Sequence, residues 1–261
     1  MGVLEIFLAT LVFTIVIMTL TWLFAVKIEN FSIIDAVWSF CFLIHTLIFF
    51  FLEDGFLPRK ILFLCMVGFW SFRLGAFLSK RISGHHPQED SRYIQLRKEY
   101  GSNYKKKFFI FFTYQAISVS FLTLPFIFIF KNRTPEILWV EWLGLAVWTL
   151  SVVGEAVADH QKITFRSNPA NAKKVCDVGL WHYSRHPNYF FESCIWWGYF
   201  LVMLGSGIYW GVYTALTMLF LLVKVTGVPL SEVQSLKARG DEFRRYQKRT
   251  SVFIPWFPKK G

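Results

Sequence analysis

The sequence predicts an all-α integral membrane protein with about seven transmembrane helices. Hydrophobic residues make up 54% of its 261 residues, and the mean hydropathy is +0.42. The apolar residues are gathered in runs of about 20, the length that crosses the hydrocarbon core of a bilayer. Runs of this length fit helices, which satisfy their own backbone groups in lipid. We interpret residues 1–261 as one domain, because no internal repeat, low-complexity tract or linker divides the chain.

The expected spans follow from these runs in order along the chain. They cover residues 4–26, 32–52, 58–79, 109–130, 137–158, 188–205 and 208–226. The first run is longer than the apolar region of a signal peptide and lacks both a basic leader and a small-residue cleavage site. We therefore expect it to remain in the protein as the first span.

The basic residues predict the orientation in the membrane. With seven spans, one side receives eight Lys and Arg in 80–108, five in 159–187 and nine in 224–261, whereas the opposite loops hold only four. The positive-inside rule then places the N-terminus outside and the C-terminus in the cytosol. We expect a multi-pass protein of the bacterial inner membrane or, in a eukaryote, of the endoplasmic reticulum.

The net charge of +11 is therefore a topology signal and no indication of nucleic-acid binding. The sequence has no zinc pattern, no compact basic recognition helix and no soluble domain to carry one. The four cysteines lack CxxC spacing, so neither a metal site nor a disulfide framework is expected. The expected partners are membrane lipids and a lipophilic small-molecule substrate.

Charged residues inside the expected spans point to a cavity. Asp35, Arg73, Glu155 and Glu192 all fall in the cytosolic halves of their helices, and charges at such depths usually face the interior of a bundle or a water-filled space. We expect a cofactor cavity open to the cytosol. A structural ion pair between Arg73 and either Asp35 or Glu155 is the alternative.

Two helical faces carry further polar pairs. Glu155 and Asp159 are separated by four residues, as are Asn188 and Glu192, so each pair lies on one side of its helix. The segment "RHPNY" at 185–189 resembles a helix start, with Pro187 where its missing N–H costs nothing. The free amides of that first turn attract phosphate, and Arg185 and His186 stand beside them. An ordinary interfacial role for His186 is the alternative.

Long motifs carry a family resemblance. The segments "EAVADHQKITF" (155–165) and "DVGLWHYSRHPNYFFESCIWWGYFL" (177–201) closely resemble the bacterial membrane proteins of the DUF1295 group, within the steroid 5-alpha-reductase-like superfamily. "DAVWSF" (35–40), "GHHPQEDSRYIQLRKEYG" (84–101) and "FRRYQKRTSVFIPWFP" (243–258) resemble further landmarks of the group. The resemblance covers most of the chain.

The resemblance implies a seven-helix bundle that holds NADPH in a cytosol-facing cavity. The expected cofactor contacts are the positions that match the cofactor residues of the steroid reductases, together with neighbouring cations and aromatic residues. They are Glu155, Asp159, Lys162, Arg166, Arg185, His186, Asn188, Tyr189, Glu192 and Tyr246. Two departures from the family's sequence pattern argue against a steroid as the substrate. Phe191 replaces a small residue of the group, and Asp35 and Trp70 stand near positions where steroid reductases carry their Gln-Glu pair and Tyr.

The implied activity is an NADPH-dependent reduction of a conjugated C=C bond in a lipophilic substrate, which requires a positioned acid. Asp35 is one expected acid, alone in an apolar span with Trp38 one turn away, where burial favours a neutral carboxyl. Tyr93, a phenol in "EDSRY", is the other.

Two other functions compete with the reductase. S-adenosylmethionine-dependent methyltransferases of the isoprenylcysteine and phospholipid type share the "RHPxY" helix start, and Glu232 with "RGDEFRRYQKRTSVFIP" (239–255) would suit them. The motif at 155–165 separates the two readings, because it belongs to the reductase-like group. A transporter or lipid-binding scaffold would carry polar residues across the whole bilayer, whereas here they stop halfway.

Overall fold

The structure is a computed structural model that describes residues 1–85 and 87–259. In this part of the chain the regular structure is helical, and no strand is formed apart from an isolated bridge between Ser184 and Ser251. Its contacts divide the chain into two compact units, Met1–Ile137 and Leu138–Gly261. A single domain over the whole chain stays a prediction.

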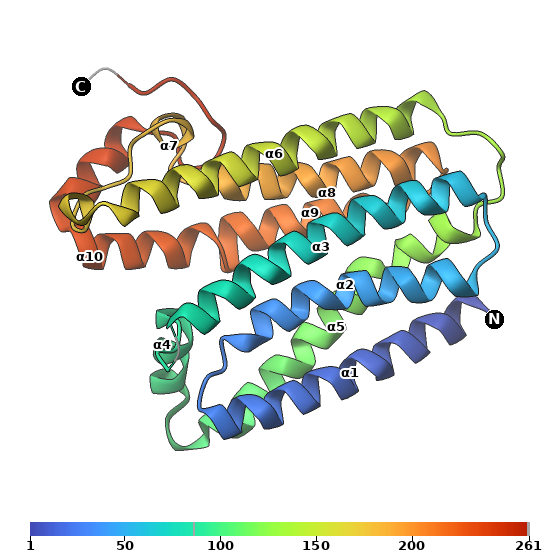
Figure 1. Ribbon diagram of the computed structural model, residues 1–261, viewed down its shortest axis with the longest axis horizontal. Helices are drawn as coiled ribbons and strands as arrows, with labels where there is room; N and C mark the ends of the chain where they lie inside the picture. The colour runs from blue at the N-terminus through green and yellow to red at the C-terminus, as the bar shows by residue number, and fades with distance from the viewer. Residues whose placement is uncertain (86, 260–261) are drawn as a thin grey trace. The chain divides into compact units, whose positions relative to one another are not determined.

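The described residues of unit 1 form five α-helices. They are α1 (Val3–Ile28), α2 (Ile33–Leu52), α3 (Leu57–His85), α4 (Ser91–Tyr100) and α5 (Tyr104–Lys131). α2 packs against α3, and α1 packs against α5 (Figure 1). His45 ties three of these helices together, since its Nε2 lies 2.6 Å from Thr14 Oγ1 of α1 and its Nδ1 lies 2.8 Å from Thr123 Oγ1 of α5. Polar groups within a bilayer need such internal partners.

The segment that leads out of unit 1 is held by backbone and side-chain contacts. Gly55 N–H donates to Phe130 O at 2.9 Å, and Phe56 N–H donates to Asn132 O at 2.8 Å. Arg59, whose side chain is fully buried, donates to the carbonyls of Thr134 and Glu136. Residues 130–136 are thereby fixed to the loop before α3 and its first turn.

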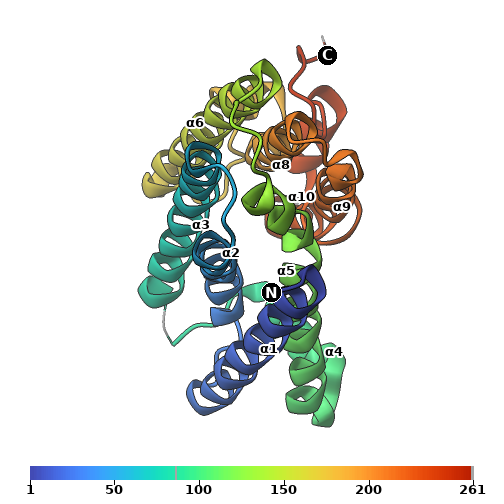
Figure 2. The same cartoon turned by 90° about the vertical axis from the view of Figure 1, so that its right-hand side faces the viewer.

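Five further α-helices form in unit 2 up to residue 259, the last one described. They are α6 (Trp139–Ser167), α7 (Leu180–Tyr183), α8 (Pro187–Gly205), α9 (Val212–Phe220) and α10 (Val228–Arg249). α6 and α8 lie side by side (Figures 1 and 2). Their close approach needs glycine, because a Cβ added at Gly144 would lie 2.8 Å from Gly198 O. Small residues at a helix–helix contact are typical of membrane proteins.

Six helical segments in the described residues are long and apolar enough to cross a membrane: Val3–Ile28, Ile33–Leu52, Leu57–Gly84, Ser91–Lys131, Trp139–Ser167 and Tyr209–Arg249. They indicate a multi-pass membrane protein. α8, which forms at the expected span 188–205, is not among the six, and its polar start, with Asn188 and Glu192, lowers its hydropathy. The seventh span and the orientation stay predictions.

Two helices extend well beyond the expected spans. α3 continues from residue 79 to His85, and α6 continues from residue 158 to Ser167. Both extensions are polar, and Lys, Arg and Gln are good helix formers, so the backbone hydrogen bonding continues where the apolar run stops. The extension of α6 carries Lys162 and Arg166, which line a pocket of unit 2.

Candidate functional site

A cationic pocket lies within unit 2. Its walls come from the end of α6, residues 174–176, the segment from α7 to the start of α8, and α10. The lining residues are Lys162, Phe165, Arg166, Lys174, Val175, Cys176, Trp181, Arg185, His186, Ser231, Ser235, Arg239, Phe243 and Tyr246. The empty space between these residues, including the part open to solvent, is about 420 Å³.

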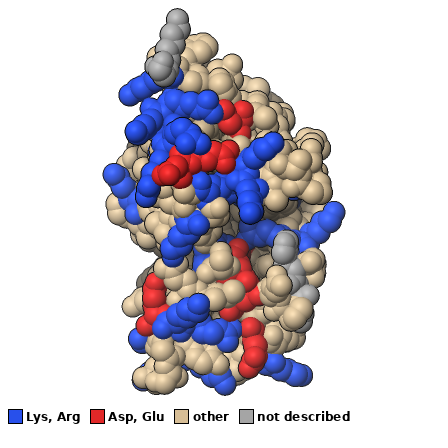
Figure 3. All heavy atoms as spheres, turned by 90° about the vertical axis from the view of Figure 1, so that its left-hand side faces the viewer, with Lys and Arg blue, Asp and Glu red and all other residues tan. Residues whose placement is uncertain are grey.

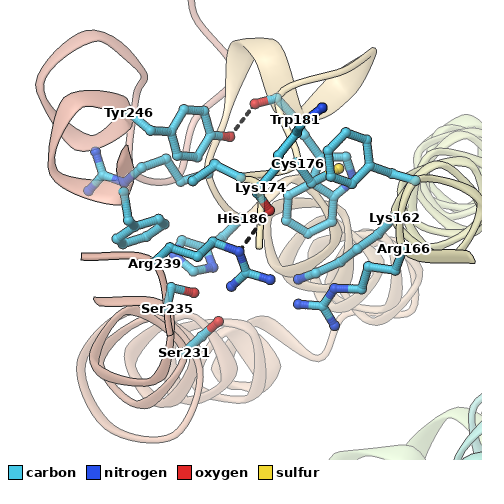
Figure 4. Close-up of a pocket in the computed structure, with 14 residues that line it drawn as sticks. Lys162, Arg166, Lys174, Cys176, Trp181, His186, Ser231, Ser235, Arg239 and Tyr246 are labelled. Atoms are coloured by element: carbon cyan, nitrogen blue, oxygen red, sulfur yellow. Dashed lines mark hydrogen bonds between the residues drawn. The ribbon is translucent and has the colours of Figure 1, made fainter. Parts of the chain in front are cut away.

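Two helix faces supply three of the five basic side chains of this pocket. Lys162 and Arg166 are one helical turn apart on α6, and Ser231, Ser235 and Arg239 follow at intervals of four along α10. Figure 4 shows the charged ends of Lys162, Arg166 and Arg239 pointing into one space, with the two hydroxyls at its edge. Three cations around one space repel one another, which favours an anion there.

Neighbouring groups orient two of these cations. The Lys162 ammonium lies 4.1 Å from the centre of the Trp181 ring, a cation–π contact. Arg239 Nε donates to Lys174 O at 2.8 Å. Lys and Arg also gather widely over the face that Figure 3 shows, with carboxylates between them. The pocket lining differs from that wider surface, because it contains no carboxylate in the residues that the structure describes.

Arg185 lies on the pocket wall and is engaged in structural contacts. Its Nε donates to Glu232 Oε1 at 2.6 Å, and its Nη1 donates to the carbonyls of Gln247 at 2.9 Å and Thr250 at 2.7 Å. The side chain is only 10% exposed. Arg185 therefore has a structural role, because it joins the start of α8 to α10.

His186 and Tyr189 form a stacked pair at the start of α8, with ring centres 5.4 Å apart. His186 Nε2 lies 3.4 Å from Glu232 Oε1. Burial lowers the pKa of His186 below its usual value, although the contact with Glu232 acts in the opposite direction. A neutral imidazole is thus favoured on the wall of the pocket.

Tyr246 braces the pocket through its hydroxyl. The Tyr246 O–H contacts Trp181 O, to which it donates, and Ser184 O at 3.2 Å. Its ring remains part of the pocket lining. Five of the ten expected cofactor residues therefore line this pocket: Lys162, Arg166, Arg185, His186 and Tyr246.

The other five expected residues lie outside the pocket lining. Asn188 Nδ2 donates to Asp159 Oδ1 at 3.4 Å, so the structure brings the two expected polar faces together. Asn188 Oδ1 is buried and accepts no hydrogen bond among the described residues. Glu192 Oε1 accepts from Trp196 Nε1 at 3.0 Å. Glu155 and Glu192 are buried, 5% and 7% exposed, and Tyr189 completes the five.

Unit 1 brings the two expected acids into direct contact. Tyr93 Oη donates to Asp35 Oδ1 at 2.6 Å, and Arg92 Nη2 donates to Asp35 Oδ2 at 2.8 Å. The expectation that Asp35 stands alone in an apolar helix is wrong. The cation that pairs with it is Arg92 of α4, not Arg73 of α3.

The reason is the position of α4, in a stretch that sequence analysis treated as a polar loop. Asp90 caps α4 by accepting from Arg92 N–H at 3.0 Å. Two hydrogen bonds then fasten this segment to the start of α2: Phe31 N–H donates to Glu89 Oε1 at 2.6 Å, and Asp90 N–H donates to Ser32 Oγ at 3.0 Å. α4 thereby carries Arg92 and Tyr93 to Asp35.

The α10 wall of the cationic pocket was not expected from the sequence. Ser231, Ser235 and Arg239 recur every four residues, which places them on one face of a helix, and Phe243 follows beyond the kink at Gly240. That spacing was the available signal. The many basic residues of 224–261 hide this signal, because their number by itself fits the positive-inside rule.

The comparisons with known proteins agree with the motifs. The family model described as "Protein of unknown function (DUF1295)" matches residues 21–250. Neither the comparison with curated proteins nor that with solved structures gave a match. The family match includes α2 to α9 and ends one residue beyond α10. This multi-pass helical chain therefore belongs to the DUF1295 family, a family of unknown function.

Proposed function

We propose that this protein is an NADPH-dependent membrane reductase that saturates a conjugated C=C bond in a lipophilic substrate. The observation that carries the proposal is the charge of the unit 2 pocket. Its described lining includes five cations, Lys162, Arg166, Lys174, Arg185 and Arg239, and no carboxylate. Such a pocket favours a ligand with several phosphate charges. It disfavours S-adenosylmethionine, which carries a net positive charge.

The residues present fit NADPH. Lys162, Arg166 and Arg239 would hold phosphate oxygens, assisted by the hydroxyls of Ser231 and Ser235. Asn188 Oδ1, a buried acceptor without a partner in the described residues, suits a carboxamide N–H. When bound, NADPH supplies a hydride for the β-carbon of the conjugated double bond.

The reduction also needs a proton at the other end of the conjugated system, and we assign the proton to Tyr93. Asp35 accepts from Tyr93 and pairs with Arg92, so it acts as an acceptor in both contacts. The mobile proton of this cluster is therefore on the Tyr93 hydroxyl. The Arg92 guanidinium carbon lies 5.6 Å from the centre of the Tyr93 ring, where its charge offsets part of the cost that burial and the Asp35 carboxylate impose on the phenolate left after transfer.

Ligand binding tests the cofactor. Purified protein in detergent should gain thermal stability with NADPH, because a ligand that binds only the folded state stabilises it by about 2.7 kcal/mol at 100 times its Kd. Arg166→Ala should reduce this gain, and Arg244→Ala, on an exposed face of α10, should leave it unchanged. Stabilisation by S-adenosylmethionine and not by NADPH would replace the reductase with the methyltransferase.

Turnover tests the acid. With a panel of lipophilic α,β-unsaturated ketones, the protein should oxidise NADPH. Tyr93→Phe should lower kcat roughly 100-fold or more, the usual contribution of a positioned acid, while the Kd for NADPH stays near wild type. Asp35→Asn should lower kcat through loss of the orienting contact. If both variants lose only folded protein and keep the kcat of the folded fraction, the proton comes from another group or from water.

A further inference from the structure

The C-terminal tail, residues 251–259, is bound to the chain just before α8. Three hydrogen bonds hold it there: Arg185 N–H to Ser251 O at 2.9 Å, Ser184 Oγ to Phe253 O at 2.7 Å, and Trp256 N–H to Tyr183 O at 2.9 Å. A fourth, from Lys259 N–H to Arg249 O at 2.9 Å, returns its end to α10. Figure 1 shows this tail leaving α10 and running past α7. Its backbone is therefore fixed.

The fixed backbone gives the tail two different faces. Phe253 is half-buried, with its ring centre 5.9 Å from that of Phe190 on α8. On the outer face, Val252 is 40% exposed, Ile254 61% and Trp256 70%, and the adjacent Phe257 is 77% exposed. We call these four outer residues the tail surface. A contiguous exposed apolar surface on an ordered segment is typical of an interaction site.

The level of the tail along α6 indicates what covers it. Trp181 Nε1 donates to Ala158 O at 2.8 Å, which sets the short helix α7 beside residue 158 of α6. That residue is the last of the expected span 137–158. Because the tail is bound to residues 183–185, the tail surface lies near the level at which α6 is expected to leave the hydrocarbon core. Exposed Trp and other aromatic side chains at this level are typical of the membrane interface.

The charges beside the tail surface fit the same partner. Lys248 and Arg249 precede the tail, Lys259 ends it, and all three are exposed. Basic side chains next to apolar ones match the charge and polarity of a bilayer surface with anionic headgroups. We propose that the tail surface inserts into the headgroup region of the bilayer, with Lys248 and Lys259 on anionic lipid headgroups. This proposal does not depend on the proposed function.

Fluorescence quenching tests the insertion. Single cysteines replace Phe257 or Asp241 in a chain whose four native cysteines are removed, and each carries an environment-sensitive fluorophore in vesicles of neutral and anionic phospholipid. The probe at 257 should show blue-shifted emission and be quenched more by a lipid spin-labelled near its headgroup than by aqueous iodide. The probe at 241, where the Asp241 side chain is 79% exposed, should show the reverse.

Two results would overturn the insertion. The first is a probe at 257 with the same emission and quenching as the probe at 241. The tail surface would then face water, as a surface for a soluble partner does. The second is stronger quenching by a spin label at the bilayer centre than by one near the headgroup, which would place the tail within the hydrocarbon core.

Lipid charge tests the basic residues. The Lys248→Gln, Lys259→Gln double variant should lose part of the blue shift at 257 in anionic vesicles and none in neutral ones. The matched control is Lys237→Gln, an exposed lysine on α10, which should keep the full shift in both. An equal shift for all three proteins in anionic vesicles would refute the contact with anionic headgroups.

Discussion

Replacing Arg185 with glutamine should destabilise unit 2 strongly. The wild-type guanidinium makes three hydrogen bonds of 2.6 to 2.9 Å, to Glu232, Gln247 O and Thr250 O, and its side chain is 10% exposed. Removing one partner of a fully buried ion pair costs about 3–5 kcal/mol, and this pair is part-buried, with the Glu232 side chain 17% exposed. Glu232 keeps its hydrogen bond from Gln247 Nε2 at 2.8 Å, so we expect the lower end of that range, about 3 kcal/mol.

The matched control is Arg244→Gln, the same substitution in α10. Arg244 pairs with Asp241 at 2.9 Å, but the two side chains are 69% and 79% exposed. Water and salt screen such a pair, which is worth about 0.2–1 kcal/mol. A difference of about 2 kcal/mol or more between the two variants is therefore expected from burial alone.

The free energy of unfolding can be measured by titrating SDS into mixed micelles and following tryptophan fluorescence. Adding Glu232→Gln to Arg185→Gln should restore part of the lost stability, because the double variant no longer leaves a half-buried carboxylate without its cation. The reasoning fails if Arg185→Gln costs no more than Arg244→Gln. It also fails if the double variant is less stable by the sum of the two single losses.

Three further predictions concern acidity, helix packing and topology. Burial lowers the pKa of His186 in the folded protein below its usual 6.5, against the opposing effect of Glu232. Between the folded-state pKa and the unfolded-state pKa of 6.5, the unfolded chain binds more protons than the folded one, so the free energy of unfolding falls as the pH drops through 6.5. His186→Gln should flatten the change in unfolding free energy between pH 7 and pH 5, and an unchanged slope would assign the effect to other groups. Gly198→Val should lower the free energy of unfolding by about 1–3 kcal/mol through overpacking, because a Cβ there would lie 2.8 Å from Trp148 Cβ. Gly84→Ala is the control and should not lower it, because no atom lies within 4 Å of the added Cβ. In a cysteine-free chain, membrane-impermeant maleimides should label single cysteines at four loop positions from the expected sides: from the cytosol at Ser102, Asn171 and Lys259, and from outside at Thr134.

The long helices could be predicted from the sequence because each coincides with a run of apolar residues. Hydropathy located the apolar middle of each expected span, including that of α8. The polar start of α8 keeps it out of the six segments that are long and apolar enough to cross a membrane. It did not locate the polar ends of α3 and α6, because backbone hydrogen bonds continue a helix regardless of side-chain polarity. The number of spans and the side on which each loop lies depend on a bilayer, and both stay predictions.

The contacts of the site were less predictable. Asp35 and Arg92 are 57 positions apart, and no periodic pattern relates a residue at the start of α2 to one on a short amphipathic helix. The sequence suggested Arg73 because it lies inside an apolar run, where an unpaired charge is costly. The four-residue spacing, in contrast, placed Asp159 on a polar face of α6 and Asn188 on a polar face of α8, and the structure brings these two residues into contact.

The segment around Arg59 has a consequence for how the protein can be divided. Residues 130–136 are fastened to the start of α3 by hydrogen bonds from Gly55, Phe56 and Arg59, and the boundary between the units follows at Ile137 and Leu138. The polypeptide passes from one unit to the other only at that peptide bond. Two separately translated fragments, 1–137 and 138–261, would therefore each keep an uninterrupted backbone. One fragment would contain Asp35, Arg92 and Tyr93, and the other fragment would contain the cationic pocket. Co-expression of the two fragments would therefore be a genetic complementation assay in which each fragment can be mutated alone.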